Sequence, residues 1–403
     1  MRPPDRLPCE VIVDILLRLP AKVLARYRSV SKLWRFLIDD PKFIELHLKH
    51  SGKISSNLSL IIKSWYLYIA DFDSLSVATE IKHPLNEVRG GTEAFGSCNG
   101  LIGVCNSEKD IALWNPSTGM YQKLAVAAYE LPGDIEICRY TFYGFGHDPV
   151  SDDYKVVRMI QFASENGDLF SAQVKVFSLK SNSWREIKGF PDYVRYMFQP
   201  YYYLFYRRGY GTFAGGALHW VAPAVLESPS TNLIVAFDLK LERFGLVQQP
   251  DRSNGIFQLD VGVLDGCLCM SCNYQNDYVD VWVMKEYGVR DSWTNLFKIT
   301  QTDVRGFSGF VMPLAYGKSC DMVLMEVDDG KLVWFDRKRR KSKKVRIEGA
   351  PGTFSAEVYV GSLIPLPGGG IDRKKQAAEE KNKNKNARKK RDDFLSEGFK
   401  LVL

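Results

Sequence analysis

Apolar residues recur at helical spacing in the first fifty residues of the chain. Val11, Ile15 and Leu19 follow the period of one helix face, and Pro20 ends that run. Three further apolar-periodic segments follow, and Asp40-Pro41 is typical of a helix start before the last one. The pattern predicts four short helices over residues 5–48. So short a chain rarely buries this much apolar surface alone, so we expect a partner or the neighbouring domain to complete the core.

From residue 58 to residue 366 the pattern changes to short alternating strands. A recurring unit consists of an apolar strand, a polar turn and often a Trp or another large apolar residue; five or six copies occur, at residues 67–71, 112–119, 176–179, 235–239, 281–283 and 333–336. A turn dipeptide precedes a strand at four places, namely Asn99-Gly100, Gly215-Gly216, Asp265-Gly266 and Asp329-Gly330. These regularities indicate a repeated all-β unit.

The length of the repeated region favours a β-propeller. Residues 58–366 correspond to about six blades at roughly 50 residues per blade. A last strand-like segment, 356–363, has no blade of its own, and we expect it to pair with the first unit and close the ring. A seventh blade and a β-sandwich remain alternatives. The predicted organisation is a helical domain (1–48), a linker (49–57), an all-β propeller (58–366) and a charged tail that is partly disordered or helical (367–403).

Charge is concentrated in the tail. The chain carries a net charge of +7, and residues 372–403 hold 11 basic and 6 acidic side chains, so the tail supplies +5 and the remainder +2. Duplex-binding domains need a basic face on the folded part. The sequence therefore predicts no nucleic-acid partner. The high aromatic content, 13%, supports the assignment of many strands.

Targeting and catalytic signals are sparse. Residues 1–6 contain no apolar signal core and no apolar run is long enough to span a bilayer, so we expect neither secretion nor membrane insertion. Eight irregularly spaced cysteines fit a reducing compartment. Cys267, Cys269 and Cys272 lack a second pair at zinc-finger spacing, so we interpret them as buried thiols. The five histidines lie in unrelated contexts. We therefore predict no catalytic residue, no metal site and no cofactor.

The helical segment resembles the F-box. The resemblance is carried by Leu7-Pro8, Glu10, Ile15-Leu16, Leu19-Pro20, Leu24, Arg26, Arg28, Val30-Ser31-Lys32, Trp34-Arg35, Ile38, Pro41 and Phe43. The remainder resembles the plant F-box-associated propeller at residues 97–101, 114–118, 144–148, 152–157 and 174–177. Together the two resemblances cover most of the chain.

The F-box resemblance implies a function without catalysis. F-box proteins dock on a Skp-type adaptor, which holds a cullin and a RING protein, and they deliver substrates of an SCF-type ubiquitin ligase by proximity. The resemblance implies a groove contact made by Leu7, Pro8, Ile15, Leu16, Leu19 and Pro20, with Val30, Trp34 and Ile38 shared between this contact and the local core. The alternative is that these residues only pack the helical domain.

Three other segments resemble plant F-box proteins that restrain defence. They are residues 206–211, 279–293 and 391–403. The resemblance implies that intracellular immune receptors are the first candidate substrates. Two other functions remain open: an adaptor-bound interaction protein that promotes no degradation, and a propeller that binds another ligand or acts as an enzyme.

An aromatic and basic stretch is the best candidate for substrate contact. Tyr and Arg are favoured interface anchors, and the candidate residues are Tyr202, Tyr203, Tyr206, Arg207 and Arg208. A buried blade strand is the alternative.

Basic clusters are candidates for nuclear import. Two tail clusters have the spacing of a two-part import signal and consist of Arg373, Lys374 and Lys375, then Arg388, Lys389, Lys390 and Arg391. A third cluster, 337–341 with 343–344, falls at a predicted hairpin turn. It is either a solvated loop, an import signal or a patch for an acidic partner. The tail favours a protein of both cytoplasm and nucleus, and the alternative is a merely solvated helix.

Overall fold

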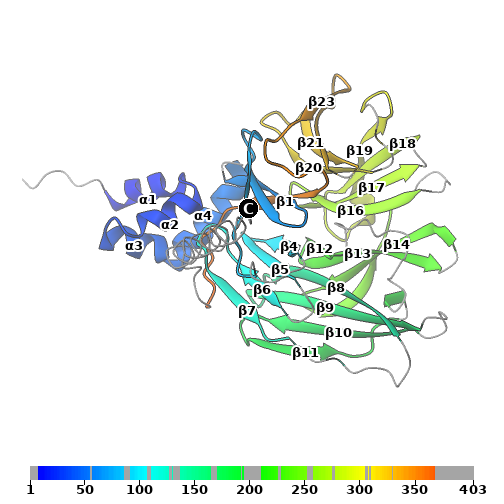
Figure 1. The fold of residues 1–403 in the computed structure, drawn as a ribbon, viewed down its shortest axis with the longest axis horizontal. Coiled ribbons are helices and arrows are strands. Elements are labelled where there is room, and N and C mark those ends of the chain that lie inside the picture. Colours follow the sequence, from blue (N-terminus) through cyan, green and yellow to red (C-terminus); the bar gives the residue numbers. More distant parts are fainter. Residues whose placement is uncertain are drawn as a thin grey trace, which may run out of the picture.

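The helices precede a ring of six β-sheets (Figure 1). The computed structural model describes residues 8–54, 57–85, 91–106, 110–126, 129, 137–164, 170–191, 193–194, 210–225, 228–251, 257–274, 277–304, 307, 310–328 and 330–367. None of the helices in these ranges is long and apolar enough to cross a membrane.

The four predicted helices are present, as α1 (Cys9–Leu17), α2 (Ala21–Tyr27), α3 (Lys32–Asp39) and α4 (Pro41–Ile54). A polar side chain caps the start of each of the last two helices. The Ser31 side chain accepts a hydrogen bond from the Trp34 N–H, and the Asp40 side chain accepts one from the Phe43 N–H at 3.0 Å. Helix α4 runs six residues past the expected boundary at residue 48, so part of the expected linker is helical. The division into domains stays a prediction.

Each sheet has four antiparallel strands and forms one blade of a propeller. In order from the centre of the ring outward, blade 1 consists of β24 (Ser355–Val360), β1 (Leu58–Lys63), β2 (Leu67–Asp71) and β3 (Ala78–Glu80), and blade 2 consists of β4 (Glu93–Cys98), β5 (Leu101–Cys105), β6 (Ile111–Trp114) and β7 (Tyr121–Leu124). Blade 3 consists of β8 (Ile137–Asp148), β9 (Asp153–Ser164), β10 (Phe170–Ser178) and β11 (Ser183–Ile187), and blade 4 consists of β12 (Thr212–Ala214), β13 (Ala217–Val225), β14 (Ser228–Asp238) and β15 (Arg243–Val247). Blade 5 consists of β16 (Gln258–Leu264), β17 (Cys267–Tyr274), β18 (Tyr278–Met284) and β19 (Trp293–Thr300), with the 3-10 turn η2 (Arg290–Ser292) before β19, and blade 6 consists of β20 (Val311–Tyr316), β21 (Met322–Val327), β22 (Lys331–Asp336) and β23 (Lys341–Val345).

The repeated unit found in the sequence is the third strand of a blade. All six copies fall on β2, β6, β10, β14, β18 and β22, so the predicted count of six blades is confirmed. The large residue after the turn lies on the fourth strand and packs back on the third. Phe177 contacts Trp184 in blade 3 with ring centroids 5.3 Å apart, and Phe237 contacts Phe244 in blade 4 at 4.8 Å.

The last strand closes the ring. Strand β24 pairs antiparallel with β1, in a register from Leu58 opposite Val360 to Lys63 opposite Ser355. The sequence prediction of a closing strand is therefore confirmed. Closure pairs the innermost strand of blade 1 with the rest of its sheet, although 294 residues separate Lys63 from its ion-pair partner Glu357.

The turn dipeptides are not all equivalent. Asn99-Gly100, Gly215-Gly216 and Asp265-Gly266 each join the first strand of a blade to the second, with positive φ at both residues. The fourth dipeptide differs, because Gly330 lies between the second and third strands of blade 6, β21 and β22. It precedes a strand as predicted, but at another place in the repeat, since any tight turn that needs positive φ selects these residue types.

The strand order gives the propeller two different faces. Turns between first and second strands and between third and fourth strands lie on one face, which we call the turn face. The chain also enters β1 and leaves β24 there, where the Gly361 N–H donates to the Asn57 carbonyl at 3.0 Å. Turns between second and third strands, and the connections from one blade to the next, lie on the opposite loop face.

Candidate functional site

The helical domain exposes two apolar stripes. Val11 and Ile15 lie one turn apart on α1, and Val30, Leu33 and Phe36 follow at three-residue spacing at the start of and along α3. Between 41% and 71% of each of these residues is exposed. Monomeric surfaces rarely concentrate so many exposed large apolar residues on so few helical turns. The two stripes are therefore a candidate binding surface.

The residues predicted for the adaptor contact divide between this surface and the core. Pro8, Ile15, Pro20 and Val30 are exposed, and Leu19 and Trp34 are half-buried. Leu16 and Ile38 are fully buried and pack with Leu24 and Phe43. Leu7 lies outside the described residues. The contact itself stays a prediction for all nine residues.

Sequence reasoning left Val11, Leu33 and Phe36 out of the predicted contact. Helical periodicity marks which residues are apolar, but it does not say which of two adjacent apolar positions faces the core. Leu33 and Phe36 share the spacing of Val30, whereas Ile38 lies on the buried side. The three-residue spacing of Val30, Leu33 and Phe36 was the signal in the sequence that could have added the last two to the predicted contact.

His47 on α4 fixes the turn between α1 and α2. Its Nε2 donates a hydrogen bond to the Leu19 carbonyl at 2.9 Å, and its ring stacks on Phe43 with centroids 6.1 Å apart. Burial lowers the pKa of His47 and outweighs the hydrogen bond to the Leu19 carbonyl, which acts in the opposite direction. The backbone of Leu19 and Pro20 is thus presented in a fixed position.

Residues 361–366, which we call the C-terminal strap, join the helices to the propeller. Leu363 packs in the core of the helical domain. On the propeller side, Asn115 Nδ2 donates to the carbonyls of Ser362 at 3.2 Å and Ile364 at 2.9 Å. The strap therefore contacts both parts of the chain at the turn face.

A central cavity of about 1200 Å³ runs between the innermost strands of the blades. Inside it, Lys63 Nζ lies 3.0 Å from Glu357 Oε2, and the Ser97 hydroxyl donates to Glu357 Oε1 at 2.5 Å. Burial alone would raise the pKa of Glu357, but the charge of Lys63 and the hydrogen bonds from Ser97 and Lys63 outweigh it and lower this pKa. The carboxylate is thus charged and paired, an arrangement that binds the first strand of blade 1 to that of blade 2.

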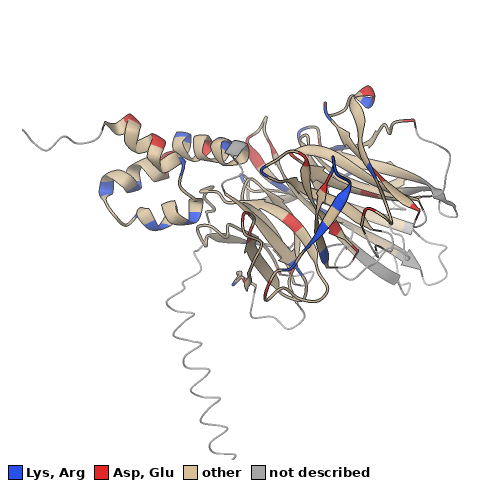
Figure 2. Ribbon diagram, turned by 90° about the horizontal axis from the view of Figure 1, so that it is seen from above, with Lys and Arg blue, Asp and Glu red and all other residues tan. Residues whose placement is uncertain are grey.

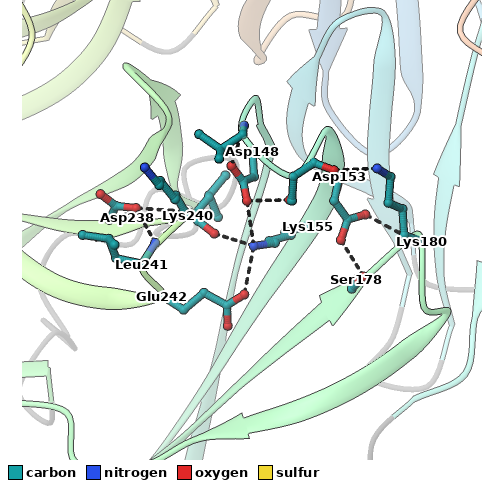
Figure 3. A network of polar contacts seen from close by, with 12 residues as sticks. Asp148, Asp153, Lys155, Ser178, Lys180, Asp238, Lys240, Leu241 and Glu242 are labelled. Atoms are coloured by element: carbon teal, nitrogen blue, oxygen red, sulfur yellow. Dashed lines mark hydrogen bonds and ion pairs between the residues drawn. The ribbon is translucent and has the colours of Figure 1, made fainter.

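A cluster of buried charges lies between blades 3 and 4 (Figure 3). Lys155 Nζ lies 3.1 Å from Asp148 Oδ2 and 2.9 Å from Glu242 Oε1, and it donates to the Leu239 carbonyl at 2.5 Å. Three acceptors use all three protons of the ammonium group. The cluster is not part of the cavity lining. Its geometry is that of a structural clasp between two blades.

Asp148 shows how strongly this clasp is organised. Burial would raise its pKa, yet hydrogen bonds from Ser151, the Val150 N–H and Lys155, together with the charge of Lys155, lower the pKa to about 2. The carboxylate is therefore ionised over the whole physiological range.

Other reactive side chains are packed as structural groups. His219 contacts the Thr212 carbonyl through Nδ1 at 3.0 Å and the Tyr287 hydroxyl through Nε2 at 2.8 Å, and burial lowers its pKa to about 4. Cys269 and Cys272 are buried and Cys267 is half-buried, in line with the interpretation as packed thiols. Within the ranges that the structure describes, no three metal-ligating side chains come together.

Two sets of predicted residues lie outside the described ranges. They are the aromatic stretch with Tyr202, Tyr203, Tyr206, Arg207 and Arg208, and the import candidates Arg373, Lys374, Lys375, Arg388, Lys389, Lys390 and Arg391. The third basic cluster, by contrast, is described. It forms the turn between β22 and β23 and continues into β23, so the predicted hairpin is confirmed.

Comparison with known proteins identifies both parts of the chain. The profile of the F-box domain matches residues 4–46, and that of the F-box associated beta propeller domain matches residues 54–363. F-box protein CPR1 of Arabidopsis thaliana is 46% identical over 98% of this chain and 99% of its own length. F-box protein At4g22390 of the same plant is 35% identical over the same shares. The chain belongs to the F-box family.

This F-box protein has the architecture of a substrate adaptor. The F-box implies binding to a Skp1-type adaptor and assembly into an SCF complex, and F-box adaptors of this kind are generally non-catalytic. Among solved structures, the propeller resembles the tricorn protease, with a TM-score of 0.37 at 10% identity over 76% of this chain and 30% of that one.

Proposed function

We propose that this F-box protein is the substrate-recognition subunit of an SCF-type ubiquitin ligase. Its helices bind a Skp-type adaptor, which brings the cullin and the RING protein, and its propeller holds a protein substrate. The observation that carries the proposal is the pair of exposed apolar stripes on a helical domain that matches the F-box. Ubiquitin transfer belongs to the other subunits, so this chain contributes proximity and needs no catalytic residue of its own.

The stripes have the right size for such a contact. Complete burial of a large apolar side chain contributes about 1.5–3 kcal/mol. Because Val11, Ile15, Val30, Leu33 and Phe36 are already partly buried, covering the rest of them contributes on the order of 5 kcal/mol. Association costs about 4–15 kcal/mol, so the stripes offset only the lower end of this cost, and the neighbouring Leu19, Pro20 and Trp34 supply further contact.

We place substrate binding on the loop face of the propeller. The turn face carries the helical domain, the strap and short turns, whereas the loop face carries the connections between blades. Trp65 and Tyr66, in the turn between β1 and β2, are 54% and 55% exposed on that face. Strands β11 and β12, which flank the predicted stretch 202–208, also end and begin there.

The identity of the substrate follows from resemblance alone. The proposal includes restraint of plant defence through turnover of intracellular immune receptors, and action in both cytoplasm and nucleus. The alternative is an adaptor-bound protein that promotes no degradation.

Protein turnover separates the two functions. The double substitution Ile15→Asp with Phe36→Asp places charges on both stripes and leaves the propeller unaltered, so it should act as a trap that binds substrate without delivering it. Proteins marked by proximity labelling with this variant should have longer half-lives in cells that express it than in cells that express the native chain. Unchanged half-lives for all of them would favour the non-degradative alternative.

A further inference from the structure

Strand β23 differs from the outermost strands of blades 3 and 4. In blades 3 and 4 the second residue of the outer strand is aromatic and packs on the third strand, as Trp184 does on Phe177 and Phe244 on Phe237. The matching position in blade 6 is Ser342, opposite Phe335. Its hydroxyl donates instead to the Asp303 carbonyl at 2.7 Å. A hydrogen bond, and not aromatic packing, therefore holds Ser342 in place, and the lysine side chains of β23 remain exposed to solvent.

The basic turn before β23 is held by its own acidic partners. Lys338 Nζ lies 2.7 Å from Asp321 Oδ2, and Arg340 pairs with Asp303 and donates to the Lys298 carbonyl at 3.1 Å. Arg337 lies over the ring of Phe297, 5.6 Å from its centroid. These basic side chains are therefore paired with groups next to the hairpin, and the contacts hold the hairpin in a defined shape.

The lysines of the strand itself are different. Lys341, Lys343 and Lys344 are exposed, and none forms an ion pair with the residues that the structure describes. β23 lies at the top of Figure 1, and the view from above shows a strand coloured blue by Lys and Arg on that side of the propeller (Figure 2). In the described sheet, β23 pairs only with β22, so the other edge of its backbone has no strand beside it.

We propose that β23 binds an acidic, extended peptide segment of a partner protein. Backbone groups along the free edge would pair with the segment, and its carboxylates would meet the three lysines. Lysines on an edge also repel other copies of the same edge, and the charges that repel a second basic strand attract an acidic one. This surface lies apart from the apolar stripes of the F-box, so it is a binding function additional to adaptor and substrate recognition.

The surroundings favour a peptide over a nucleic acid. Single-stranded nucleic acids need aromatic platforms for base stacking and a continuous basic groove. No exposed large aromatic residue lies on β23 or its turn, and Asp321, Asp336 and Glu348 interrupt the positive surface.

Fluorescence anisotropy tests this proposal on the full chain bound to its adaptor. The probe is a short fluorescein-labelled peptide with consecutive glutamates between threonines and valines, because Lys344 lies on the opposite face of β23 from Lys341 and Lys343. Replacement of Lys341, Lys343 and Lys344 by Gln should weaken its binding about tenfold, the combined effect of three surface ion pairs. Lys123→Gln with Lys240→Gln and Lys285→Gln changes the net charge equally at scattered exposed sites and should leave binding unchanged.

Two further probes separate the causes of binding. A copy of the peptide with N-methyl groups at alternate backbone positions cannot pair with the strand edge and should bind more weakly than the parent peptide. The proposal is overturned if the two lysine variants bind alike or the methylated copy binds as well as its parent. It is also overturned if single-stranded RNA of equal charge displaces the peptide more effectively than unlabelled peptide does.

Discussion

At the scale of single residues, buried charges in this protein stabilise the joints between blades. Lys155 is paired with Asp148 and Glu242, and all three side chains are less than one-tenth exposed. Removal of one of them leaves the charge of its partners buried without a full counter-charge, which destabilises the fold. The polar residues of the alternating strands were visible in the sequence. Their pairing across blades was not, because it depends on contacts between residues such as Lys155 and Glu242 that only the closed ring brings together.

Asp148→Asn should lower the stability of the propeller in a pH-dependent manner. The folded pKa of Asp148 is about 2, below the ordinary value of 3.8, so its charge stabilises the fold above about pH 4 and this contribution is lost as the pH falls toward 2. The loss at neutral pH should be about 2 kcal/mol, at 1.36 kcal/mol per pKa unit. Urea denaturation at pH 7 and pH 3 measures it, and the difference between variant and native chain should shrink at pH 3.

Asp152→Asn is the matched control, because the Asp152 side chain is 83% exposed in the same turn and its positive φ suits Asn. It should change the urea midpoint little at either pH. An equal loss for Asp148→Asn at both pH values would show that the carboxylate charge is not what stabilises the clasp.

At the scale of elements, the C-terminal strap connects the F-box to the propeller. Asn115 is fully buried and satisfies two strap carbonyls, so Asn115→Ala leaves them without a donor at a cost of about 1–3 kcal/mol. Amide hydrogen exchange should become faster in residues 361–366, with little change in blades 4 and 5. Thr118→Ala lies in the same turn, and its side chain accepts a hydrogen bond from the Met120 N–H and, among the described residues, bonds to no strap residue, so it is the control and should leave strap exchange unchanged. If Asn115→Ala leaves it unchanged too, the strap is held by something other than this side chain.

Local pattern predicted most elements and a smaller part of their contacts. The third strands were found because each is an apolar segment that runs into a polar turn, and several lead to an aromatic partner, as with Phe177 and Trp184. The strap has no periodic pattern, so its role was not predictable. The binding stripes on α1 and α3 were only partly predicted, since Ile15 and Leu16 are adjacent and apolar yet one is exposed and the other buried.

At the scale of the whole molecule, stability depends on closing the ring through β24. A chain that ends at residue 354 lacks this strand and exposes the edge of β1, so it should aggregate or lose its cooperative thermal transition. A chain that ends at residue 367 keeps the strand and the strap, so its melting temperature should equal that of the full protein. Thermal unfolding with light scattering distinguishes them. Soluble, cooperatively melting protein from the shorter chain would show that closure is dispensable.

The order of domains and the number of blades were accessible from the sequence, because both depend on local repeats. The assignment of the two faces was not. It needed the pairing of β24 with β1, which fixes where the chain leaves the ring and hence which face carries the F-box.

The central claim is that the apolar stripes of the F-box bind a Skp-type adaptor, and co-purification from cells that express both proteins tests it most directly. Ile15→Asp with Phe36→Asp should abolish recovery of the adaptor, because each charge would be buried unpaired in the contact. Leu246→Asp, at an exposed apolar position on β15, should recover it as the native chain does. Equal recovery with the native chain and with the double variant, both folded by circular dichroism, would contradict the account.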